Sequence, residues 1–348
     1  MEFNYKIKQK KEDFIVDEIS LQPDFCDHEK SDFSYLWIEK RGMTTFDALD
    51  EIKKEYNLSH EDVAAQGLKD EDGVTSQMIS IKKILFQNDV NLFNEKFNSD
   101  DYKLQIKNIV GHGIESLKPR FLHGNNFKLV IRNLDEETAK SFYGNCRDNR
   151  FNSFINYYDN QRFGIVGGPY NTHLIGKAIV DNDWVSAFRE FERSKNTEIE
   201  SIEKPAELNS HHCRNYFRKI NFSKLAFFVS SYNSHLWNKS VGDYLTREEI
   251  EKHNHDFHKV GLLPLPKEHI FKLPNLFTVD AHDINKETFE VSPKPQTRNL
   301  IVTTTVYPIK IEQDELNDNK HCVQVSFFLP TGCYATMLIK QIFLKINR

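Results

Sequence analysis

The sequence has no apolar run of about 18 residues, the length that a membrane-spanning helix requires. Its N-terminus alternates charged and apolar residues, a pattern that argues against a signal peptide. Cysteine is scarce, and the five cysteines show neither metal-ligand nor redox spacing, so we expect reduced thiols in a cytoplasmic protein. Repeats and low-complexity tracts are also absent, which indicates an ordinary globular chain.

The chain also lacks the strong basic excess of many nucleic-acid-binding proteins, since its net charge is -5 and its pI is about 6.3. Lysine and arginine nevertheless form short clusters, for example at residues 6–11 and 214–219. Such clusters keep RNA binding open because the local field matters more than the total charge, although each alone is typical of a solvated face. With 348 residues, 39% of them hydrophobic, the chain is long enough for two domains.

Apolar periodicity predicts strands in the first third and last fifth of the chain and helices in the middle. The expected strands are residues 5–9, 13–18, 35–40, 78–81, 103–110, 127–133 and 322–329. The expected helices are residues 45–55, 136–149, 183–191, 223–245 and 334–344, and the first should bury Phe46, Leu49, Ile52 and Tyr56. Residues 246–298 show no strong period and are expected to be irregular. This order predicts an α+β fold whose sheet core is interrupted by a mainly helical insertion.

The segment from Gly67 to Gln77 is rich in acidic residues and glycine, which is typical of a shaped loop rather than a packed element. Asp70 is the first catalytic candidate, because a well-held carboxylate can act as a nucleophile or as an acid/base. Thr75 and Gln77 can hydrogen-bond and hold the loop. An acidic turn without chemistry explains the same residues, and the loop alone does not decide between the two interpretations.

A second candidate segment, Asn156 to Gly164, places aromatic rings beside amide and guanidinium groups. This combination suits a flat RNA base, because a ring can stack on one face while amides and arginine bind its edges or a phosphate. Tyr158, Gln161 and Arg162 are the side chains that would do so, together with Asn156. The alternative is an aromatic-rich strand of the core.

Six segments, in the same order along the chain, resemble motifs of the TruD family of pseudouridine synthases. The Asp70 loop is similar to G-x-K-D-x-x-x-V-T-x-Q, and residues 156–164 are similar to N-Y-F-G-x-Q-R-F-G. The other four are K-x-x-P-E-D-F at residues 8–14, L-x-G-N-x-F at 122–127, S-Y-Q-S-x-L-F-N at 231–238 and L-P-x-G-S-Y-A-T at 329–336. The resemblance therefore extends over nearly the whole chain.

The chain departs from these motifs at a few positions. Tyr158 stands in place of Phe, Asp159 in place of Gly, and Glu71 where the family usually carries Lys or Arg. Asp159 adds a negative charge and removes the backbone freedom of glycine, so we expect it to affect the local turn. Glu71 is expected to change how RNA is bound.

The resemblance implies a pseudouridine-synthase-type fold with a mixed, mainly antiparallel sheet core. Residues 1–166 and 298–348 would form this core, and residues 167–297 a mostly helical TruD-type insertion domain. The implied reaction is isomerisation of a uridine to pseudouridine in tRNA, at uridine 13, without a cofactor or a metal. Asp70 would be the catalytic carboxylate, and it would either attack the ribose C1′ or assist glycal formation by proton transfer.

The resemblance also implies a set of substrate-binding residues. Tyr158 would stack on the uracil, and Lys8 is the candidate cation that keeps Asp70 ionised. Lys69 is closer in sequence but is expected to point away. The full set is Tyr158, Asn156, Lys8, Phe14, Gln161, Arg162, Thr75 and Gln77.

The expected partner is RNA, above all tRNA, with no membrane and no metal, and the expected assembly is a monomer. Two other functions remain open from the sequence. One is a non-catalytic protein that binds RNA and assists tRNA folding while retaining the fold. The other is a hydrolase that uses Asp70 and a distant carboxylate as acid and base.

Overall fold

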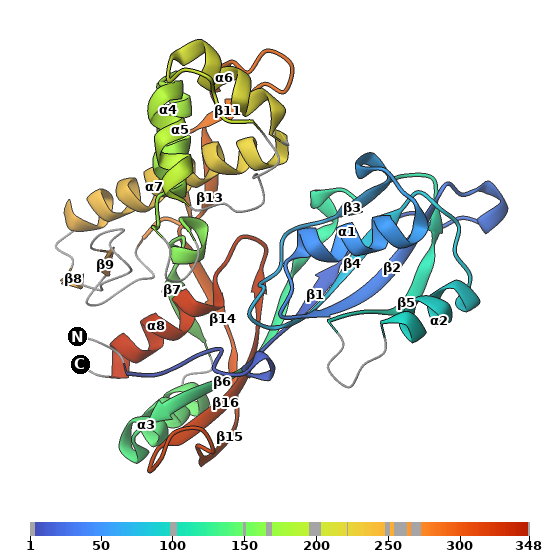
Figure 1. Cartoon of the computed structure of the whole chain (residues 1–348). Coiled ribbons are helices and arrows are strands. Elements are labelled where there is room, and N and C mark those ends of the chain that lie inside the picture. Colours follow the sequence, from blue (N-terminus) through green and yellow to red (C-terminus); the bar gives the residue numbers. More distant parts are fainter. Residues whose placement is uncertain are drawn as a thin grey trace. The chain divides into compact units, whose positions relative to one another are not determined.

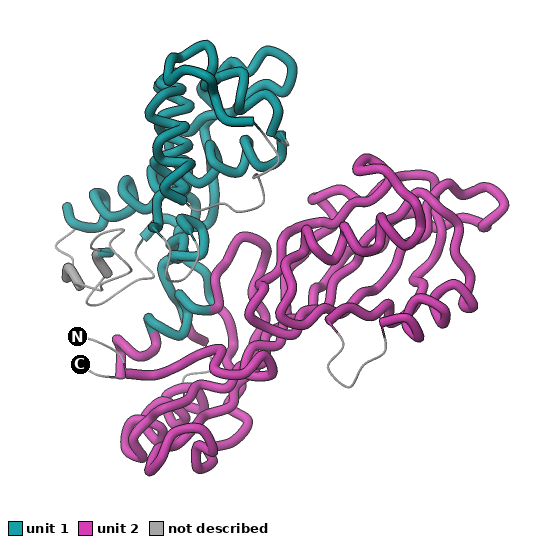
Figure 2. The backbone as a smooth tube through the Cα atoms, viewed as in Figure 1, with its two compact units in different colours: residues 1–2, 153–303, 336–341 teal, residues 3–152, 304–335, 342–348 magenta. Residues whose placement is uncertain are grey.

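The computed structural model describes residues 4–97, 103–148, 151–164, 169–194, 203–220, 222–247, 251–253, 263–265 and 273–346. Its helices and strands are labelled in Figure 1, and Figure 2 shows the two compact units into which the chain divides. We call one the sheet unit, which comprises Phe3–Asn152, Thr304–Ala335 and Ile342–Arg348. The other is the helical unit, which comprises Met1–Glu2, Ser153–Thr303 and Thr336–Gln341.

The sheet unit is built on an eight-stranded sheet with the order β15-β16-β6-β1-β4-β2-β5, in which β3 also pairs with β4. The strands are β1 Phe14–Ser20, β2 Phe33–Arg41, β3 Val63–Ala65, β4 Val74–Ile81, β5 Leu104–Gly113, β6 Leu122–Leu134, β15 Val306–Gln313 and β16 His321–Pro330. Among these strand pairs only β1 and β4 are parallel. The predicted α+β fold with a mixed, mainly antiparallel sheet is therefore confirmed.

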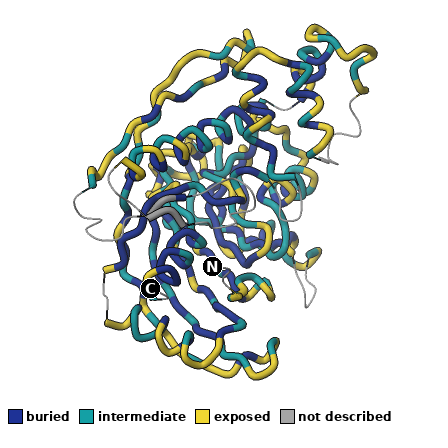
Figure 3. Tube along the Cα trace, turned by 90° about the vertical axis from the view of Figure 1, so that its left-hand side faces the viewer, coloured by how far each residue is buried: buried dark blue, intermediate teal, exposed yellow. Residues whose placement is uncertain are grey.

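Strand β4 lies inside this sheet, and its residues are buried along the whole strand because neighbours flank it on both sides and helices cover it. Two helices, α1 Thr45–Tyr56 and α2 Gln87–Lys96, pack their buried residues against β2, β4 and β5 in one apolar cluster. Figure 3 colours the chain by burial, with buried residues in dark blue and exposed residues in yellow. The sheet unit also contains α3 Glu136–Asp148.

Helix α1 begins where the sequence predicts, because Thr44 accepts a hydrogen bond from the backbone N–H of Asp47 at 3.1 Å. The predicted buried face is wrong at Phe46, which is 47% exposed. Ala48 and Ile52 face the core together with Thr45, whose hydroxyl is used in a loop contact described below. In the first turn of α1, the smaller hydrogen-bonding residue Thr45 is therefore buried, and the aromatic residue Phe46 is exposed.

The predicted strand at residues 5–9 is wrong as well. Only Lys6 pairs with a strand residue, through two backbone hydrogen bonds of 3.0 and 2.9 Å with Arg132. Lys8 has a φ of 67°, in the left-handed region that interrupts an extended chain. The alternating pattern at residues 5–9 therefore does not form a strand.

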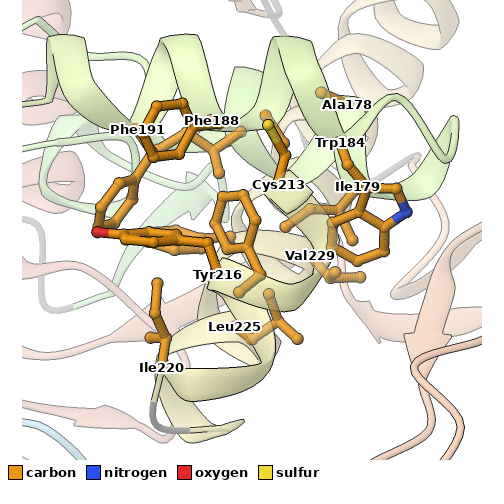
Figure 4. Packing of buried hydrophobic residues seen from close by; sticks show 14 of the residues in the cluster. Ala178, Ile179, Trp184, Phe188, Phe191, Cys213, Tyr216, Ile220, Leu225 and Val229 are labelled. Carbon is orange, nitrogen blue, oxygen red and sulfur yellow. The ribbon is translucent and has the colours of Figure 1, made fainter. Parts of the chain in front are cut away.

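The helical unit contains α4 Thr172–Val180, α5 Trp184–Arg193, α6 Ser210–Lys219 and α7 Phe222–Arg247. Large rings from these helices, among them Trp184, Phe188 and Tyr216, interlock in its core (Figure 4). The predicted helices at 183–191 and 223–245 correspond to α5 and α7. Helix α8, Ala335–Ile346, agrees with the prediction for 334–344.

Short strands complete the helical unit, and those from β8 to β13 correct the expectation that residues 246–298 are irregular. The strands are β7 Asn152–Ile155, β8 Glu251–His253, β9 Leu263–Leu265, β10 Leu276–Val279, β11 His282–Ile284, β12 Val291–Pro293, β13 Gln296–Asn299 and β14 Ile301–Thr304. They pair two by two and not in one large sheet, so they show little apolar alternation. Within the described ranges, no helix is long and apolar enough to cross a membrane.

Candidate active site

The loop that carries Asp70 lies in the sheet unit between β3 and β4. It reaches β4 through Gly73, where a side chain would bring its Cβ within 2.4 Å of the Phe14 carbonyl oxygen. Only glycine permits this close approach of the loop to the start of β1. The loop is therefore seated against the N-terminal motif that includes Phe14.

Lys8 and Asp70 form an ion pair in this loop, with 2.9 Å between Lys8 Nζ and Asp70 Oδ1. The lysine side chain is 13% exposed and the aspartate side chain 22%, so the pair is shielded but remains open to a substrate. Lys8 Nζ also lies 4.2 Å from the centre of the Phe14 ring, a cation–π contact. The structure thus brings together three of the residues that the sequence singled out.

The left-handed backbone of Lys8 costs roughly 1–3 kcal/mol, and a surrounding framework has to maintain it. That framework centres on the buried Arg132 guanidinium, which donates to Asp13 at 2.9 and 2.8 Å and to Asp314 at 2.9 Å. Its hydrogen bonds to Asp13 raise the pKa of Arg132 despite burial. The acidic residue of the N-terminal motif therefore anchors the segment that presents Lys8.

Lys69 points away from the Asp70 carboxylate. Its Nζ lies 2.5 Å from Glu18 Oε2, and both side chains are almost fully buried. Glu18 also accepts a hydrogen bond from the backbone N–H of Met78 at 3.1 Å. This internal pair ties the loop to strands β1 and β4.

Thr75 and Gln77 lie on β4 and are fully buried. Gln77 donates to the Gly67 carbonyl at 3.3 Å and accepts from the Thr45 hydroxyl at 3.2 Å, and that hydroxyl in turn accepts from the Lys69 N–H at 2.9 Å. Gln77 thus holds both the loop and the first turn of α1. The Thr75 hydroxyl has no hydrogen-bond partner among the residues that the structure describes.

The sequence did not single out Lys40, which belongs to the same loop environment. Its Nζ donates to the carbonyls of Asp70 at 2.6 Å, Met43 at 2.7 Å and Lys69 at 3.4 Å, and the residue is 0% exposed. Burial lowers the pKa of Lys40 to about 8, against the opposing attraction of Asp70 and Glu71. The available signal was a lysine next to Glu39 at the end of the strand predicted at residues 35–40, whose first four residues are apolar. Glu71 itself is exposed.

The other predicted site residues lie in the helical unit. Asn156 is buried and bonded to the chain: its N–H donates to Leu300 at 2.8 Å, its side chain donates to the Asn299 carbonyl at 3.1 Å, and its carbonyl accepts from Trp237 at 3.2 Å. It therefore fixes the segment that leads to Tyr158. Gln161 is exposed.

Tyr158 is held at its backbone, its hydroxyl and its ring. Asn238 makes two hydrogen bonds of 2.9 Å with its backbone, and Gln296 donates to its hydroxyl at 2.8 Å. The guanidinium carbon of Arg298 lies 3.9 Å from the ring centre, and that of Arg162 lies 5.9 Å away. The tyrosine is thus a fixed aromatic surface with cationic groups beside it.

Arg162 is positioned by helix α7. Its Nε donates to the Ser234 hydroxyl at 3.1 Å, a second donor binds Ser230, and the guanidinium lies 4.8 Å from the ring centre of Phe227. Ser231 donates to the Arg162 carbonyl at 2.8 Å. The motif at residues 231–238 therefore serves to hold the segment 156–162.

Asp159, the departure from the family's glycine, is accommodated without strain, since its φ of -93° suits any residue. It is buried, and it accepts from Lys340 at 2.6 Å, from the Asn160 N–H at 2.8 Å and from the Thr336 hydroxyl. Burial alone would raise the pKa of Asp159, but the Lys340 charge and these hydrogen bonds together lower it. Helix α8 supplies two of the partners of this buried carboxylate, Thr336 and Lys340.

Comparison with known proteins gives one consistent result. The family model for tRNA pseudouridine synthase D (TruD) matches residues 2–208. The protein named "Probable tRNA pseudouridine synthase D 1" from Methanococcus maripaludis is 24% identical over 405 residues, which covers 97% of this chain and 99% of that protein. tRNA pseudouridine synthase D from Leptospira interrogans is also 24% identical, over 410 residues, covering 98% of this chain and 96% of that protein.

A crystal structure from Methanosarcina mazei, named as a TruD protein, resembles this chain with a TM-score of 0.55. The sequences are 19% identical, and the likeness covers 97% of this chain and 93% of the other. At that identity the likeness shows a common fold, with sheet and helices arranged as in a TruD protein.

Proposed function

Because the chain belongs to the tRNA pseudouridine synthase D (TruD) family, we propose that it isomerises a uridine of tRNA to pseudouridine, at uridine 13. The reaction breaks the bond between ribose C1′ and uracil N1, rotates the uracil and forms a bond between C1′ and C5. The hydrogen on C5 is released as a proton and N1 gains one, so atoms balance without a cofactor.

The observation that carries this proposal is the Lys8–Asp70 pair on a loop fixed by buried contacts. A carboxylate paired with a fixed cation is held in one orientation, as nucleophilic or acid/base catalysis requires. Asp70 acts either by attack on C1′ or by proton transfer that leads to a glycal. Both routes use the same carboxylate.

Tyr158 is proposed as the stacking surface for the uracil, and Arg162 as a contact to the RNA. The target base has to leave its stack, which costs a few kcal/mol, and stacking on an aromatic ring returns roughly 1–3 kcal/mol per base. Tyr158 belongs to the helical unit and Asp70 to the sheet unit. The proposal that Tyr158 and Asp70 act on the same uridine is based on the resemblance of their motifs to those of the family.

The remaining expectations are proposals of the same kind. We propose that the protein acts as a monomer in the cytoplasm, with residues 167–297 as the insertion domain between core segments 1–166 and 298–348. Recognition would depend mainly on RNA shape and phosphate contacts, since A-form grooves expose little sequence.

The direct test is release of tritium from tRNA that carries 5-tritiated uridine. We expect release by the wild-type protein and none by Asp70→Asn, with tRNA binding retained. Asp72→Asn is the matched control, because Asp72 lies in the same loop, is exposed and has no proposed role. If the wild-type protein bound tRNA but released tritium from no cellular RNA, the proposal would be contradicted and a non-catalytic RNA-binding protein favoured. Free uracil as the product would indicate a hydrolase.

A further inference from the structure

Lys40 is a buried ammonium whose contacts are all to backbone oxygen. Its three acceptors are the carbonyls of Met43, Lys69 and Asp70, at 2.7, 3.4 and 2.6 Å. Across the described ranges, no carboxylate lies within ion-pair distance of its Nζ, and the residue is 0% exposed. A charge buried in this way is costly, and an apolar side chain of similar volume would pack there without that cost.

The position of Lys40 explains what this cost achieves. Lys40 lies on β2 directly opposite Thr75 on β4, close to the end of both strands. The chain turns at Gly42 after β2, and its N–H donates to the Gly73 carbonyl at 3.3 Å. The Lys40 ammonium therefore joins the turn before α1, through Met43, to the two loop residues Lys69 and Asp70.

Two lysines act on Asp70 from different sides. Lys8 binds the carboxylate, whereas Lys40 binds the backbone carbonyl of the same residue. A carbonyl fixed at 2.6 Å sets the position of the Asp70 Cα and hence the direction in which its side chain leaves the loop. Lys8 then selects the orientation of the carboxylate itself.

We propose that Lys40 is a positioning residue for Asp70, which holds the loop in its working geometry through hydrogen bonds from a protonated amine. This inference rests on the proposed function, because it concerns the residue to which that function assigns the chemistry. It predicts that the loop depends on the protonation state of Lys40. A neutral amine has only two N–H donors and a lone pair, so it cannot satisfy the same three carbonyls.

The charged groups around Lys40 act in both directions. Burial lowers its pKa to about 8, Asp70, Glu71 and Asp47 raise it, and Lys69 lowers it. Protonated Lys40 is thus the dominant form below pH 8 and is lost as the pH rises above it. We therefore expect kcat to fall above pH 8, because the loop then loses hydrogen bonds from the Lys40 ammonium.

Stability should change in the opposite direction. The pKa of Lys40 is lowered from 10.5 to about 8 on folding, so between these values the unfolded chain binds a proton that the folded chain does not. The contribution of Lys40 to the free energy of unfolding is consequently least favourable below pH 8 and rises up to pH 10.5. If Lys40 served stability alone, its deprotonation between pH 8 and 10.5 would raise stability without lowering activity.

The experiment compares Lys40→Met, Lys40→Arg and the control Lys54→Met with the wild type, using tritium release from tRNA between pH 6 and pH 10. The pH window brackets the Lys40 pKa of about 8. Lys54 is exposed on α1 and pairs with Glu51. For Lys40→Met we expect a fall in kcat of about 100-fold with little change in KM, as for a small misplacement of a catalytic group. Lys40→Arg keeps a charge that does not titrate, so its remaining activity should lack the decline above pH 8.

Several results would overturn the proposal. One is a kcat for Lys40→Met equal to that of Lys54→Met, and another is a decline above pH 8 that persists in Lys40→Arg. Urea unfolding of each variant separates a folding defect from a positioning defect, and it measures the predicted rise of wild-type stability relative to Lys40→Met. If the wild type releases no tritium, the proposed function fails. In that case urea unfolding alone tests Lys40. If the difference in stability between the wild type and Lys40→Met does not change between pH 8 and 10.5, Lys40 does not bury a titrating ammonium.

Discussion

Charged groups hold the Asp70 loop, whereas mainly neutral groups hold the segment around Tyr158. In the sheet unit, Lys8, Lys40 and the Lys69–Glu18 pair fix the loop from three directions. In the helical unit, Asn238, Gln296 and the serines of α7 fix Tyr158 and Arg162. The loop that we propose for catalysis and the ring that we propose for stacking thus have different kinds of support, and they should respond differently to substitution.

The largest effect on activity should come from Lys8→Met, which removes the cation from Asp70 and leaves the Phe14 ring in place. We expect kcat for tritium release to fall by roughly 100-fold, the typical loss when one stabilising donor is removed from an active site. Lys10→Met is the control, since Lys10 belongs to the same segment but pairs with exposed Glu315. Equal kcat values for the two variants would show that Lys8 has no part in the chemistry.

The next effect concerns stability, at the buried ion pair between Asp159 and Lys340 in the Tyr158 segment. Asp159→Gly restores the family residue but leaves Lys340 without its carboxylate, so we expect the free energy of unfolding to fall by about 2 kcal/mol. The wild-type contribution of the lowered Asp159 pKa is present at neutral pH and is lost as the pH falls below 3.8.

A control for this prediction is Asp283→Asn, which breaks an exposed pair with Lys294 in the same unit. Exposed pairs contribute at most about 1 kcal/mol, so urea unfolding should show a smaller loss there. The Asp159–Lys340 pair would be unimportant for the fold if both substitutions had the same effect.

Substitutions of Tyr158 test the segment that is held by mainly neutral groups. Tyr158→Ala should weaken tRNA binding by roughly 1–3 kcal/mol through lost stacking. Tyr158→Phe, which loses only the hydroxyl contact with Gln296, should change it by less than about 1 kcal/mol. Filter binding at fixed salt measures both, and a Phe variant as weak as the Ala variant would place the importance in the hydroxyl and not in the ring.

The smallest effect should be on salt dependence. If Arg162 contacts a phosphate, Arg162→Gln should lower the slope of log affinity against log salt concentration by about 0.7–0.9. Tyr158→Phe keeps every charge and should leave the slope unchanged. An unaltered slope in Arg162→Gln means that the guanidinium does not bind a phosphate.

The sequence was informative where local pattern decides the structure. The order of most strands and helices could be read from short segments, and the motifs placed Lys8 near Asp70 by resemblance. Phe46 shows the limit of apolar periodicity, because the inner position went to Thr45, which bonds the loop.

Long-range contacts lay beyond sequence reasoning. Asp159 could be seen as a departure from glycine, but its partner Lys340 lies 181 residues away. Lys40 resembles the polar end of a strand, and its role depends on three carbonyls that only the folded loop brings together. The short strands between 273 and 304 pair without a common sheet, so no periodic signal marks them.

The most direct test is a pseudouridine map of tRNA from cells that lack the gene and carry the wild type, Asp70→Asn or Asp72→Asn. We expect pseudouridine at position 13 with the wild type and with Asp72→Asn, and unmodified uridine with Asp70→Asn or without the gene. Pseudouridine 13 that persists in cells carrying only Asp70→Asn, or that does not depend on the gene, would contradict the assignment of Asp70 and of the reaction.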